Sequence, residues 1–403
     1  MIQLTNEHVK LIMLAAQGLL DEVHKPAEKA DVLQAIRRMG ALQIDTIHVV
    51  ARSPYLSLFS RLGSYDPRWL GELLAEGALF EYWAHAASFL PVEDYPYFRR
   101  MMLTPRFGWN NREAWEAAHP QVSEMVLERL RKEGALRSAD FENPNHKGGT
   151  WWDWKEEKMA LEHLLTAGLV MVARREKFQR VYDLRERILP DWDDARTPSH
   201  DEVRRVLALK TVRAMGIVRP EWVPDYFRIS KRDIAKLLQE LAAGGQLLEV
   251  SVDGWDAPAY IHPEQRGLLE TTAAGGLTAS LTTLLSPFDA LLWDRSRARA
   301  VFNFDFALEC YLPAPKRKYG YFCLPVLRRG SLVGRADAKA HRQAGLFEVK
   351  TLYLEPGTEF TGEVQADIQA ALQRCADWHA TPEVAIRKVI RMGMRDDSLG
   401  LAL

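Results

Sequence analysis

The chain has 403 residues, of which 47% are hydrophobic and 27% are charged, so two or three folded domains are expected and a disordered protein is excluded. The formal net charge of -1 excludes a strongly basic tail that binds nucleic acid. A local basic groove that is balanced by acidic residues elsewhere is not excluded, because net charge does not describe how the charges are distributed.

The first chemically informative segment follows a helix that is expected over residues 27–39 and ends at a glycine. Apolar and polar residues then alternate, so that on an extended chain Gln43 and Asp45 project to the same side. A carboxylate and an amide directed at one point suit glycoside hydrolysis, in which a positive, sugar-like transition state develops. Alternatively, Asp45 caps a helix that begins at Thr46, since Asp is a favoured N-cap residue. Spacing alone favours the cap.

Three segments of the chain repeat one pattern. Each begins as an amphipathic, Leu-rich helix, reaches a glycine of the kind that ends helices, and continues as an apolar, strand-like run. In the second and third segments a polar turn and another strand-like run follow. The three segments are residues 69–91, 161–184 and 234–261.

The residues before the second and third segments extend this pattern. Amphipathic helices are expected over residues 122–130 and 203–215, followed by the short turn segments GALRSADF and PEWVPDYF. Two helices joined by a turn and followed by a two-stranded hairpin make a winged helix, whose second helix usually enters the DNA major groove. Three similar copies favour a tandem winged-helix array over the alternative, which is a set of generic α+β packing units.

Beyond residue 282 the sequence changes character and becomes rich in β-structure. Strands are expected over residues 319–327, 331–339 and 346–354, separated by polar turns, and a helix over residues 362–379. These strands predict a sheet or a small barrel.

Together the patterns predict an α+β fold class, with about three tandem winged-helix modules followed by a C-terminal β-sheet or barrel domain. We expect the first module, which includes the Gln43/Asp45 segment, over residues 1–118, the second over 119–197, the third over 198–275, and the β-domain with its helix over 276–403. The acidic stretch at residues 191–197 is the expected connector between the second and third modules.

Basic side chains gather at two places. The second hairpin carries Arg174, Arg175, Lys177 and Arg180, the expected recognition helix before it carries Lys155 and Lys158, and the β-domain carries Lys316, Arg317 and Lys318 beside aromatic residues. Basic residues of this kind suit contacts with DNA phosphates, and basic residues beside aromatic rings suit a nucleic-acid backbone and its bases. Taken one residue at a time, a solvated hairpin tip explains the second hairpin equally well.

Several other kinds of site are not expected. Cys310, Cys323 and Cys375 lack CxxC spacing, which excludes a disulfide scaffold and a Cys-rich zinc module and fits a reducing cytosol. The sequence has no HExxH, no Rossmann GxGxxG and no GxxxxGK[ST] motif, so neither a metal nor a nucleotide cofactor is expected. No apolar run reaches the roughly 18 residues of a membrane span, and residues 1–30 do not resemble a signal peptide, so the expected location is the cytoplasm.

Longer motifs carry a resemblance to a known family. They are LQIDTIHVVARSPYLSLFSRLG, FEYWAHAASFLP, FQRVYDL, SPFDALLWDR, ECYLPAPKRKYGYF and GRADAKAHR. Together they resemble the YcaQ/AlkZ family of bacterial DNA glycosylases, and the YcaQ branch more closely, over essentially the whole chain. The resemblance implies tandem winged helices and a C-terminal β-domain in a C-shape around DNA.

The family signature is Gln, an apolar residue, and then Gln or Asp, which here reads Gln43-Ile44-Asp45. The resemblance therefore implies that Asp45 provides negative charge near C1′ and activates a water, and that Gln43 orients the water or the sugar. The Asp at the second polar position implies the YcaQ-like branch, which tolerates a wider range of N7-alkylguanine lesions.

Three further residues are candidates for the same site. Arg52 and Ser53 follow the signature and are expected to bind a phosphate near the lesion. His85 lies in the motif FEYWAHAASFLP and is expected to line the site, although a lone His is as often structural.

The leading hypothesis is a monofunctional DNA glycosylase of base excision repair, which removes cationic N7-alkylguanine and unhooks interstrand crosslinks. Its expected partner is double-stranded DNA with alkylated or crosslinked bases, and the protein is expected to be a monomer without cofactor or membrane contact. The alternative is a non-enzymatic winged-helix DNA-binding protein such as a regulator, which does not need the Gln43/Asp45 pair.

Overall fold

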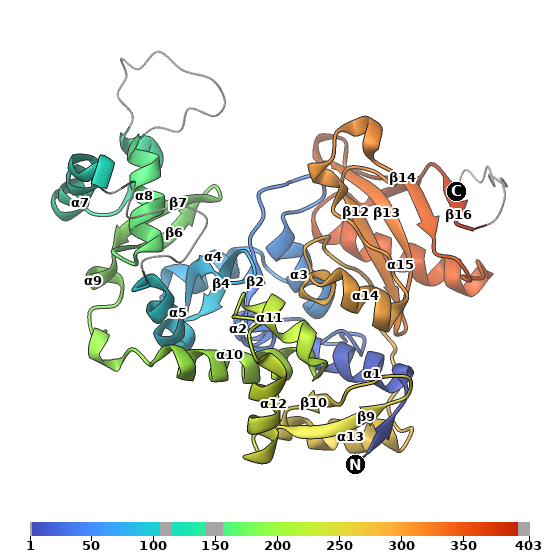
Figure 1. Cartoon of the computed structure of the whole chain (residues 1–403). Helices are drawn as coiled ribbons and strands as arrows, with labels where there is room; N and C mark the ends of the chain where they lie inside the picture. Colours follow the sequence, from blue (N-terminus) through green and yellow to red (C-terminus); the bar gives the residue numbers. More distant parts are fainter. Residues whose placement is uncertain (1, 105–114, 116, 142–155, 394–403) are drawn as a thin grey trace. The chain divides into compact units, whose positions relative to one another are not determined.

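The structure, a computed structural model, describes residues 2–104, 115, 117–141 and 156–393 (Figure 1). The chain divides into two compact units, one made of Met1–Asp66 and Leu207–Leu403 and the other of Pro67–Val206. Among the described residues, none of the helices has both the length and the apolar character that crossing a membrane requires.

The first unit begins with the elements that surround the Gln43/Asp45 segment. They are β1 (Gln3–Leu4), α1 (Asn6–Gln17), α2 (Lys29–Met39), β2 (Leu42–Gln43) and α3 (Ser53–Leu62). The helix predicted over residues 27–39 is confirmed as α2, and it ends at Gly40, whose φ of 72° is left-handed. Glycine adopts this conformation without the steric cost that a Cβ atom would add.

The second unit consists of helices and two small antiparallel sheets. Its elements are α4 (Arg68–Ala75), β3 (Leu79–Trp83), β4 (Ala87–Pro91), α5 (Tyr95–Met102), α7 (Pro120–Glu133), β5 (Leu136–Arg137), α8 (Glu156–Thr166), β6 (Val170–Glu176), β7 (Gln179–Leu184) and α9 (Arg185–Ile188). Strands β3 and β4 form a hairpin, and β5, β7 and β6 form a sheet in that order. The predicted helix at 122–130 and the second predicted hairpin are confirmed as α7 and β6–β7.

The long helix α10 (His200–Met215) leads the chain back into the first unit, where the same order of elements recurs. It is followed by β8 (Ile217–Val218), α11 (Val223–Tyr226), α12 (Ile234–Ala243), β9 (Leu248–Val252), β10 (Ala259–Ile261) and α13 (Arg266–Ala273). The sheet order is β1-β9-β10-β8, with β9 and β10 as the hairpin. A helix, a short strand, a second helix and a hairpin therefore occur both here and around β5–β7.

The C-terminal part of the first unit is a larger sheet covered by a helix (Figure 1). Its elements are β11 (Thr282–Leu284), α14 (Arg295–Phe302), β12 (Cys323–Arg328), β13 (Ser331–His341), β14 (Leu346–Leu354), α15 (Gly362–Trp378), β15 (Glu383–Ile386) and β16 (Val389–Arg391). Strands β11 to β15 follow in sequence order, and β16 also pairs with β14. Helix α15 places its buried residues Ile368 and Leu372 against this sheet. The strand predicted from residue 319 begins only at Cys323.

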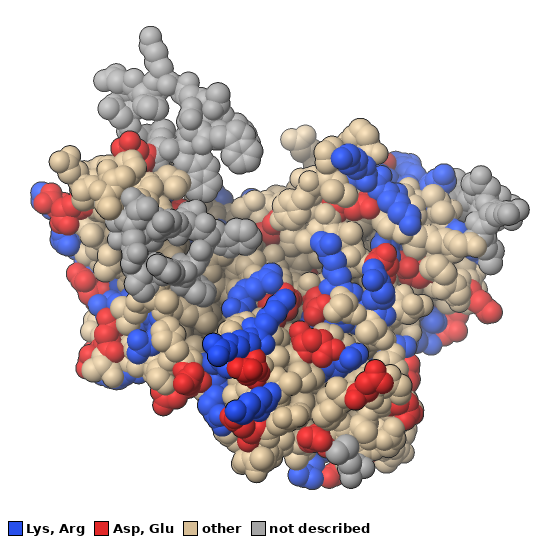
Figure 2. Space-filling view, viewed as in Figure 1, with Lys and Arg blue, Asp and Glu red and all other residues tan. Residues whose placement is uncertain are grey.

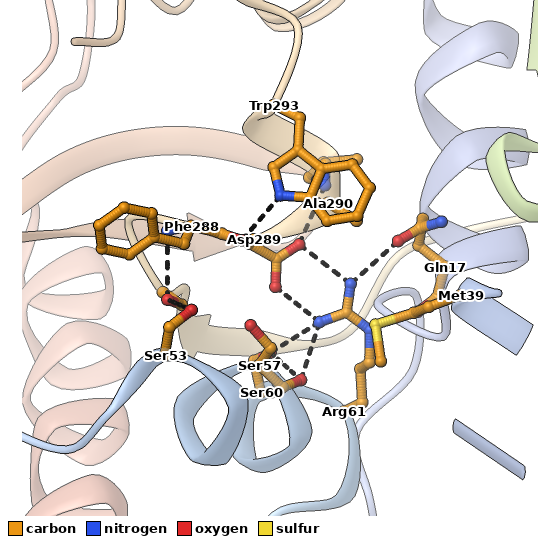
Figure 3. A network of polar contacts seen from close by, with 12 residues as sticks. Gln17, Met39, Ser53, Ser57, Ser60, Arg61, Phe288, Asp289, Ala290 and Trp293 are labelled. Carbon is orange, nitrogen blue, oxygen red and sulfur yellow. Dashed lines mark hydrogen bonds and ion pairs between the residues drawn. The ribbon is translucent and has the colours of Figure 1, made fainter. Parts of the chain in front are cut away.

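A buried ion pair joins α3 to the segment between β11 and α14 (Figure 3). The Arg61 guanidinium donates to both carboxylate oxygens of Asp289, at 2.7 and 3.0 Å, and the two side chains are 2% and 0% exposed. Its remaining N–H groups donate to the Gln17 carbonyl at 2.9 Å, the Gln17 amide oxygen at 3.0 Å and the Ser57 carbonyl at 2.8 Å. All five donors of the guanidinium are thereby satisfied, which is the condition for burying this charge at low cost.

The same segment contacts the start of α3. The hydroxyls of Ser53 and Ser286 lie 2.9 Å apart, and the Phe288 amide donates to the Ser286 hydroxyl at 3.2 Å. The Asp289 carboxylate also accepts the Leu291 amide at 3.0 Å. The motif SPFDALLWDR therefore contacts both ends of α3, through Ser53 and Arg61. These contacts fix the position of the helix that follows the Gln43/Asp45 segment.

We predict that Asp289→Ala lowers the free energy of unfolding by about 3–5 kcal/mol, because it leaves the Arg61 charge buried without its partner. Urea denaturation measures this loss. The matched control is Asp305→Ala, which breaks an Arg–Asp pair with Arg299 whose side chains are 66% and 79% exposed, and this loss should stay below about 1 kcal/mol. Equal losses for the two variants would show that burial of the Arg61–Asp289 pair has no special weight.

Candidate active site

The Gln43/Asp45 segment is extended, and its side chains alternate in burial. Leu42 and Ile44 are 1% and 8% exposed, whereas Gln43 and Asp45 are half-buried. This alternation confirms the predicted period of two and leaves the amide and the carboxylate on the less buried side. The alternative that Asp45 caps a helix at Thr46 is wrong, because the next helix is α3 and its N-cap is Arg52.

The Asp45 carboxylate is held by two hydrogen bonds. Its Oδ1 accepts the Ile47 amide at 2.7 Å, and its Oδ2 accepts the Tyr311 hydroxyl at 3.3 Å. Burial raises the pKa of Asp45 above its usual value, and the two hydrogen bonds oppose this shift without cancelling it. A carboxylate with a raised pKa is a stronger base than a solvated one, which suits the activation of a water.

The loop that carries Tyr311 is closed on itself by a carboxylate. Glu309, which is 9% exposed, accepts the backbone amides of Tyr319 at 2.7 Å and Gly320 at 3.1 Å. Gly320 has a φ of 146°, and a Cβ atom there would lie 2.4 Å from the Asp337 carboxyl carbon. The loop from 309 to 320 is therefore fixed at both ends, and only glycine fits where it joins β12.

The aromatic residues at the end of this loop differ in their roles. The guanidinium of Arg335, 2% exposed, lies 4.2 Å from the centre of the Tyr319 ring and pairs with Glu355. Tyr321, by contrast, is 38% exposed, and the Arg317 guanidinium lies 4.7 Å from its ring centre. Tyr319 is thus part of the packing of the β-sheet, whereas Tyr321 is exposed and contacts Arg317.

The three basic residues of the loop differ in their exposure and their contacts. Lys316 and Lys318 are exposed, and the Lys318 ammonium lies 4.8 Å from the Tyr319 ring centre. Arg317 is half-buried and donates to the Leu312 carbonyl at 2.9 Å. Leu312 follows Tyr311 directly, so Arg317 is bound to the backbone next to the residue that donates to Asp45.

A second group of cations lies just after the signature. Arg342, in the turn between β13 and β14, donates to the Val50 carbonyl. Burial and the charges of Arg342 and Arg52 lower the pKa of His48 to about 4, and burial and Arg342 lower that of His379 to about 4. Among the described residues, every charge that shifts these two pKa values is positive, which is the electrostatic setting of an anion site.

Ser53 does not belong to this surface, although it was predicted to bind a phosphate. It is 1% exposed, and its hydroxyl lies 2.9 Å from that of Ser286. Its role in the structure is to join α3 to the Arg61–Asp289 region. Arg52 is half-buried at the N-terminus of α3 and stays a candidate.

The second hairpin also departs from the sequence prediction. The guanidinium groups of Arg175 and Arg180 pair with Glu81, whose side chain is 1% exposed, and Arg180 pairs further with Glu162 at 2.8 Å. The Arg175 and Arg180 side chains are only 9% and 18% exposed. They join the β3–β4 hairpin to β6 and β7 inside the second unit, so they do not form the predicted phosphate-binding surface.

Arg174 and Lys177 lie on the outside of the same hairpin. The Arg174 side chain is 46% exposed and pairs with Glu176 at 2.8 Å. Lys177 is exposed at the turn, with a φ of 48°. Because both side chains are exposed, these two residues stay candidates for a contact with a phosphate.

We predict that Arg175→Gln lowers the free energy of unfolding by about 3 kcal/mol, because the Glu81 carboxylate loses a partner inside the fold. The neighbouring Arg174→Gln removes the same charge from an exposed position and should change the free energy of unfolding by less than about 0.5 kcal/mol. Thermal and urea unfolding of the two variants measure the difference. Weaker DNA binding by Arg175→Gln at unchanged stability would restore Arg175 as a phosphate ligand.

The other predicted residues lie in the second unit. His85 is half-buried in the turn of the β3–β4 hairpin, and Lys158 is exposed on α8. Lys155 lies outside the described residues. Asp45 and Gln43 belong to the first unit, so the site built around Asp45 rests on first-unit residues alone.

Three features were missed in the sequence. Tyr311 stands in the motif ECYLPAPKRKYGYF but lies 266 positions from Asp45, and Arg342 in GRADAKAHR lies 292 positions from Val50. The third is a basic patch between α11 and the first turn of α12, where lysines and arginines gather (Figure 2). Its exposed members are Arg228, Lys231, Arg232 and Lys236. Their run of basic residues was the available signal.

Metal chemistry has no visible site in the described part of the chain, where no group of three or more His, Cys, Asp or Glu side chains is arranged to hold an ion. The chemistry available around Asp45 is that of a carboxylate, an amide, a phenol and nearby cations.

Comparison with known proteins adds a family to this geometry. Residues 36–378 match the family described as DNA glycosylase AlkZ-like. Among solved structures, the fold is similar to that of the Streptomyces sahachiroi DNA glycosylase AlkZ, with a TM-score of 0.62 and 18% sequence identity over 95% of this chain and 100% of that one. The matched residues include the Gln43/Asp45 segment, the Tyr311 loop and the Arg61–Asp289 pair.

Proposed function

The chain belongs to the AlkZ-like DNA glycosylase family, and on this premise we propose that it hydrolyses the N-glycosidic bond of cationic N7-alkylguanine in DNA and unhooks interstrand crosslinks of that chemistry. The observation that carries the proposal is the Asp45 carboxylate, half-buried and ordered by Ile47 and Tyr311 beside a surface that holds Arg317. A regulator that only binds DNA has no use for a desolvated carboxylate in this position.

The proposed reaction needs little help for the leaving group. Alkylation at N7 gives guanine a positive charge, so the electron pair of the C1′–N9 bond passes to the base, which leaves neutral. The sugar takes on oxocarbenium character, a water forms the new bond to C1′, and its proton passes to the Asp45 carboxylate. Gln43, on the same side of the extended segment, orients the water or the sugar. The product is an abasic site, as expected of a monofunctional glycosylase.

The Asp45 carboxylate acts mainly through its charge. A preorganised group of this kind is typically worth about 2.7–4 kcal/mol of transition-state stabilisation, because it does not reorganise as the charge develops. The hydrogen bonds from Ile47 and Tyr311 supply this preorganisation, and burial strengthens the interaction by removing competing water.

We further propose that the repeated helix–strand–helix–hairpin units are winged-helix modules that bind double-stranded DNA. The support is that two small sheets have the same make-up, with the orders β5-β7-β6 and β9-β10-β8. In each, one helix precedes the short strand, β5 or β8, and another helix precedes the hairpin. Of the exposed cations in this region, Lys236 lies on α12, the helix that would enter a groove in such a module, and Arg228, Lys231 and Arg232 lie in the connection just before it.

The cations next to the signature suit one phosphate of the lesion strand. Arg52 is the N-cap of α3, whose N-terminal backbone amides favour an anion, and Arg342 donates to the Val50 carbonyl. Burial and, after it, the charge of Arg52 lower the pKa of Arg342, and a phosphate bound there would offset both effects.

We predict that Asp45→Asn abolishes release of 7-methylguanine from methylated DNA while binding to the same DNA persists. The substitution removes the charge that stabilises C1′ but keeps the size of the side chain, and the amide oxygen can still accept the Ile47 N–H. Chromatography of the released base and a binding titration are the two measurements. Asp305→Asn, at an exposed position, is the matched control and should release base at the wild-type rate.

Two results would count against the enzyme. Near-normal release by Asp45→Asn would remove Asp45 from the reaction. Binding of methylated DNA by the wild-type protein without any release would favour the alternative, a winged-helix DNA-binding protein such as a regulator.

We predict that Arg342→Gln weakens DNA binding and lowers the slope of log affinity against log salt concentration by about 0.9, because one phosphate contact is lost. Titrations at several salt concentrations measure the slope. The control is Arg329→Gln, which removes the same charge from a residue paired with Glu363 and Asp367 on α15. An unchanged slope for Arg342→Gln, or an equal change for both variants, would contradict the phosphate site.

A further inference from the structure

Tyr311 combines two properties that ordinary tyrosines of a fold do not combine. Its side chain is among the most exposed large hydrophobic groups described, with 67% of the residue accessible, and its hydroxyl nevertheless donates to the Asp45 carboxylate at 3.3 Å. An aromatic ring that was present only for packing would be covered, and a hydroxyl that was present only for solubility would face water.

The ring is held in place from behind. The Phe288 ring, 2% exposed, meets the Tyr311 ring edge to face at 6.3 Å between centres and 74° between planes. Phe288 belongs to the segment fixed by Arg61 and Asp289, and Glu309 fixes the backbone two residues before Tyr311. The position of the ring is therefore set by the fold, and its free face is open.

We propose that the Tyr311 ring is the surface on which the alkylated purine stacks, and that its hydroxyl positions the Asp45 carboxylate at the C1′ of the stacked nucleotide. The inference rests on the proposed function and deepens it by naming how the lesion is recognised. A cationic purine is drawn to the electron-rich face of a tyrosine more strongly than a neutral one. The hydroxyl then links recognition of the base to the position of the reactive charge.

The hydroxyl is tested through the pH dependence of base release. The groups that bear on Asp45 are the Tyr311 phenol and the Cys310 thiol, and burial raises the pKa of both, to about 11 for Cys310, so both are neutral in acid. The hydrogen bond from Tyr311 lowers the pKa of Asp45. Tyr311→Phe removes it, so the pKa of Asp45 rises and the reactive carboxylate is lost at a higher pH.

The expected result for Tyr311→Phe is an acid limb of the single-turnover rate that is displaced to higher pH, with unchanged affinity for lesion DNA. The control is Tyr321→Phe, which removes a nearby hydroxyl. That hydroxyl does not shift the pKa of Asp45, so the acid limb of this variant should keep the wild-type midpoint. Superimposable profiles of Tyr311→Phe and the wild type overturn the positioning role.

The ring is tested by binding. In an Asp45→Asn background, where no base is released, adding Tyr311→Leu should weaken binding to DNA with 7-methylguanine by roughly 5- to 150-fold, the effect of losing one stacked base. Binding to abasic-site DNA, which has no base to stack, should stay within about twofold. Equal losses for both DNAs, or no loss for either, overturn the inference.

The failure of this inference differs from the failure of the proposed function. If the wild-type protein releases no 7-methylguanine, the proposed function is wrong. If the wild type releases it and the Tyr311 variants match their reference proteins, the glycosylase stands and only the role of Tyr311 is refuted.

Discussion

The buried pair of Arg61 and Asp289 is the interaction on which the candidate site depends. It has no access to water, with both side chains at most 2% exposed, and it is tolerated because the guanidinium also donates to Gln17 and Ser57. The pair holds α3 against the 286–293 segment. At the start of that segment, the Ser286 hydroxyl contacts the Ser53 hydroxyl, and the Phe288 ring packs against the Tyr311 ring. A buried polar network can stabilise one arrangement over others because any shift leaves a charge unpaired.

The near-zero net charge is compatible with basic surfaces because several arginines are used inside the fold. Arg61, Arg175, Arg180 and Arg335 each meet a carboxylate inside the fold, so their charges contribute little to the surface. The cations that remain accessible include Lys316 and Lys318 on the Tyr311 loop and the patch between α11 and the first turn of α12. A protein with net charge -1 can therefore present basic surfaces, since part of its acidic charge pairs with arginines inside each unit.

The sequence predicted what local patterns determine. The alternation from Leu42 to Asp45, the glycine after α2 and the second hairpin are properties of a few neighbouring residues, and the structure agrees with them. The sequence could not predict contacts between residues that lie far apart in the chain. Arg175 looks like a surface cation until Glu81, 94 positions away, is placed beside it, and Tyr311 has no link to Asp45, 266 positions away, until the β-domain is folded. Ser53 was misjudged for the same reason, because its partner is Ser286.

The environment of Asp45 destabilises its ionised form, and the proposed substrate would offset this. Burial alone favours the protonated carboxyl, and the Ile47 amide and the Tyr311 hydroxyl keep the balance closer to the ionised form. A cationic purine brings a positive charge, which stabilises the carboxylate while the base is bound. As the glycosidic bond breaks, this positive charge moves from the base to the sugar. A neutral guanine brings no such charge and leaves only if it is protonated, which a carboxylate cannot do. Selectivity for alkylated bases then follows from electrostatic balance at Asp45, without a pocket shaped to each alkyl group.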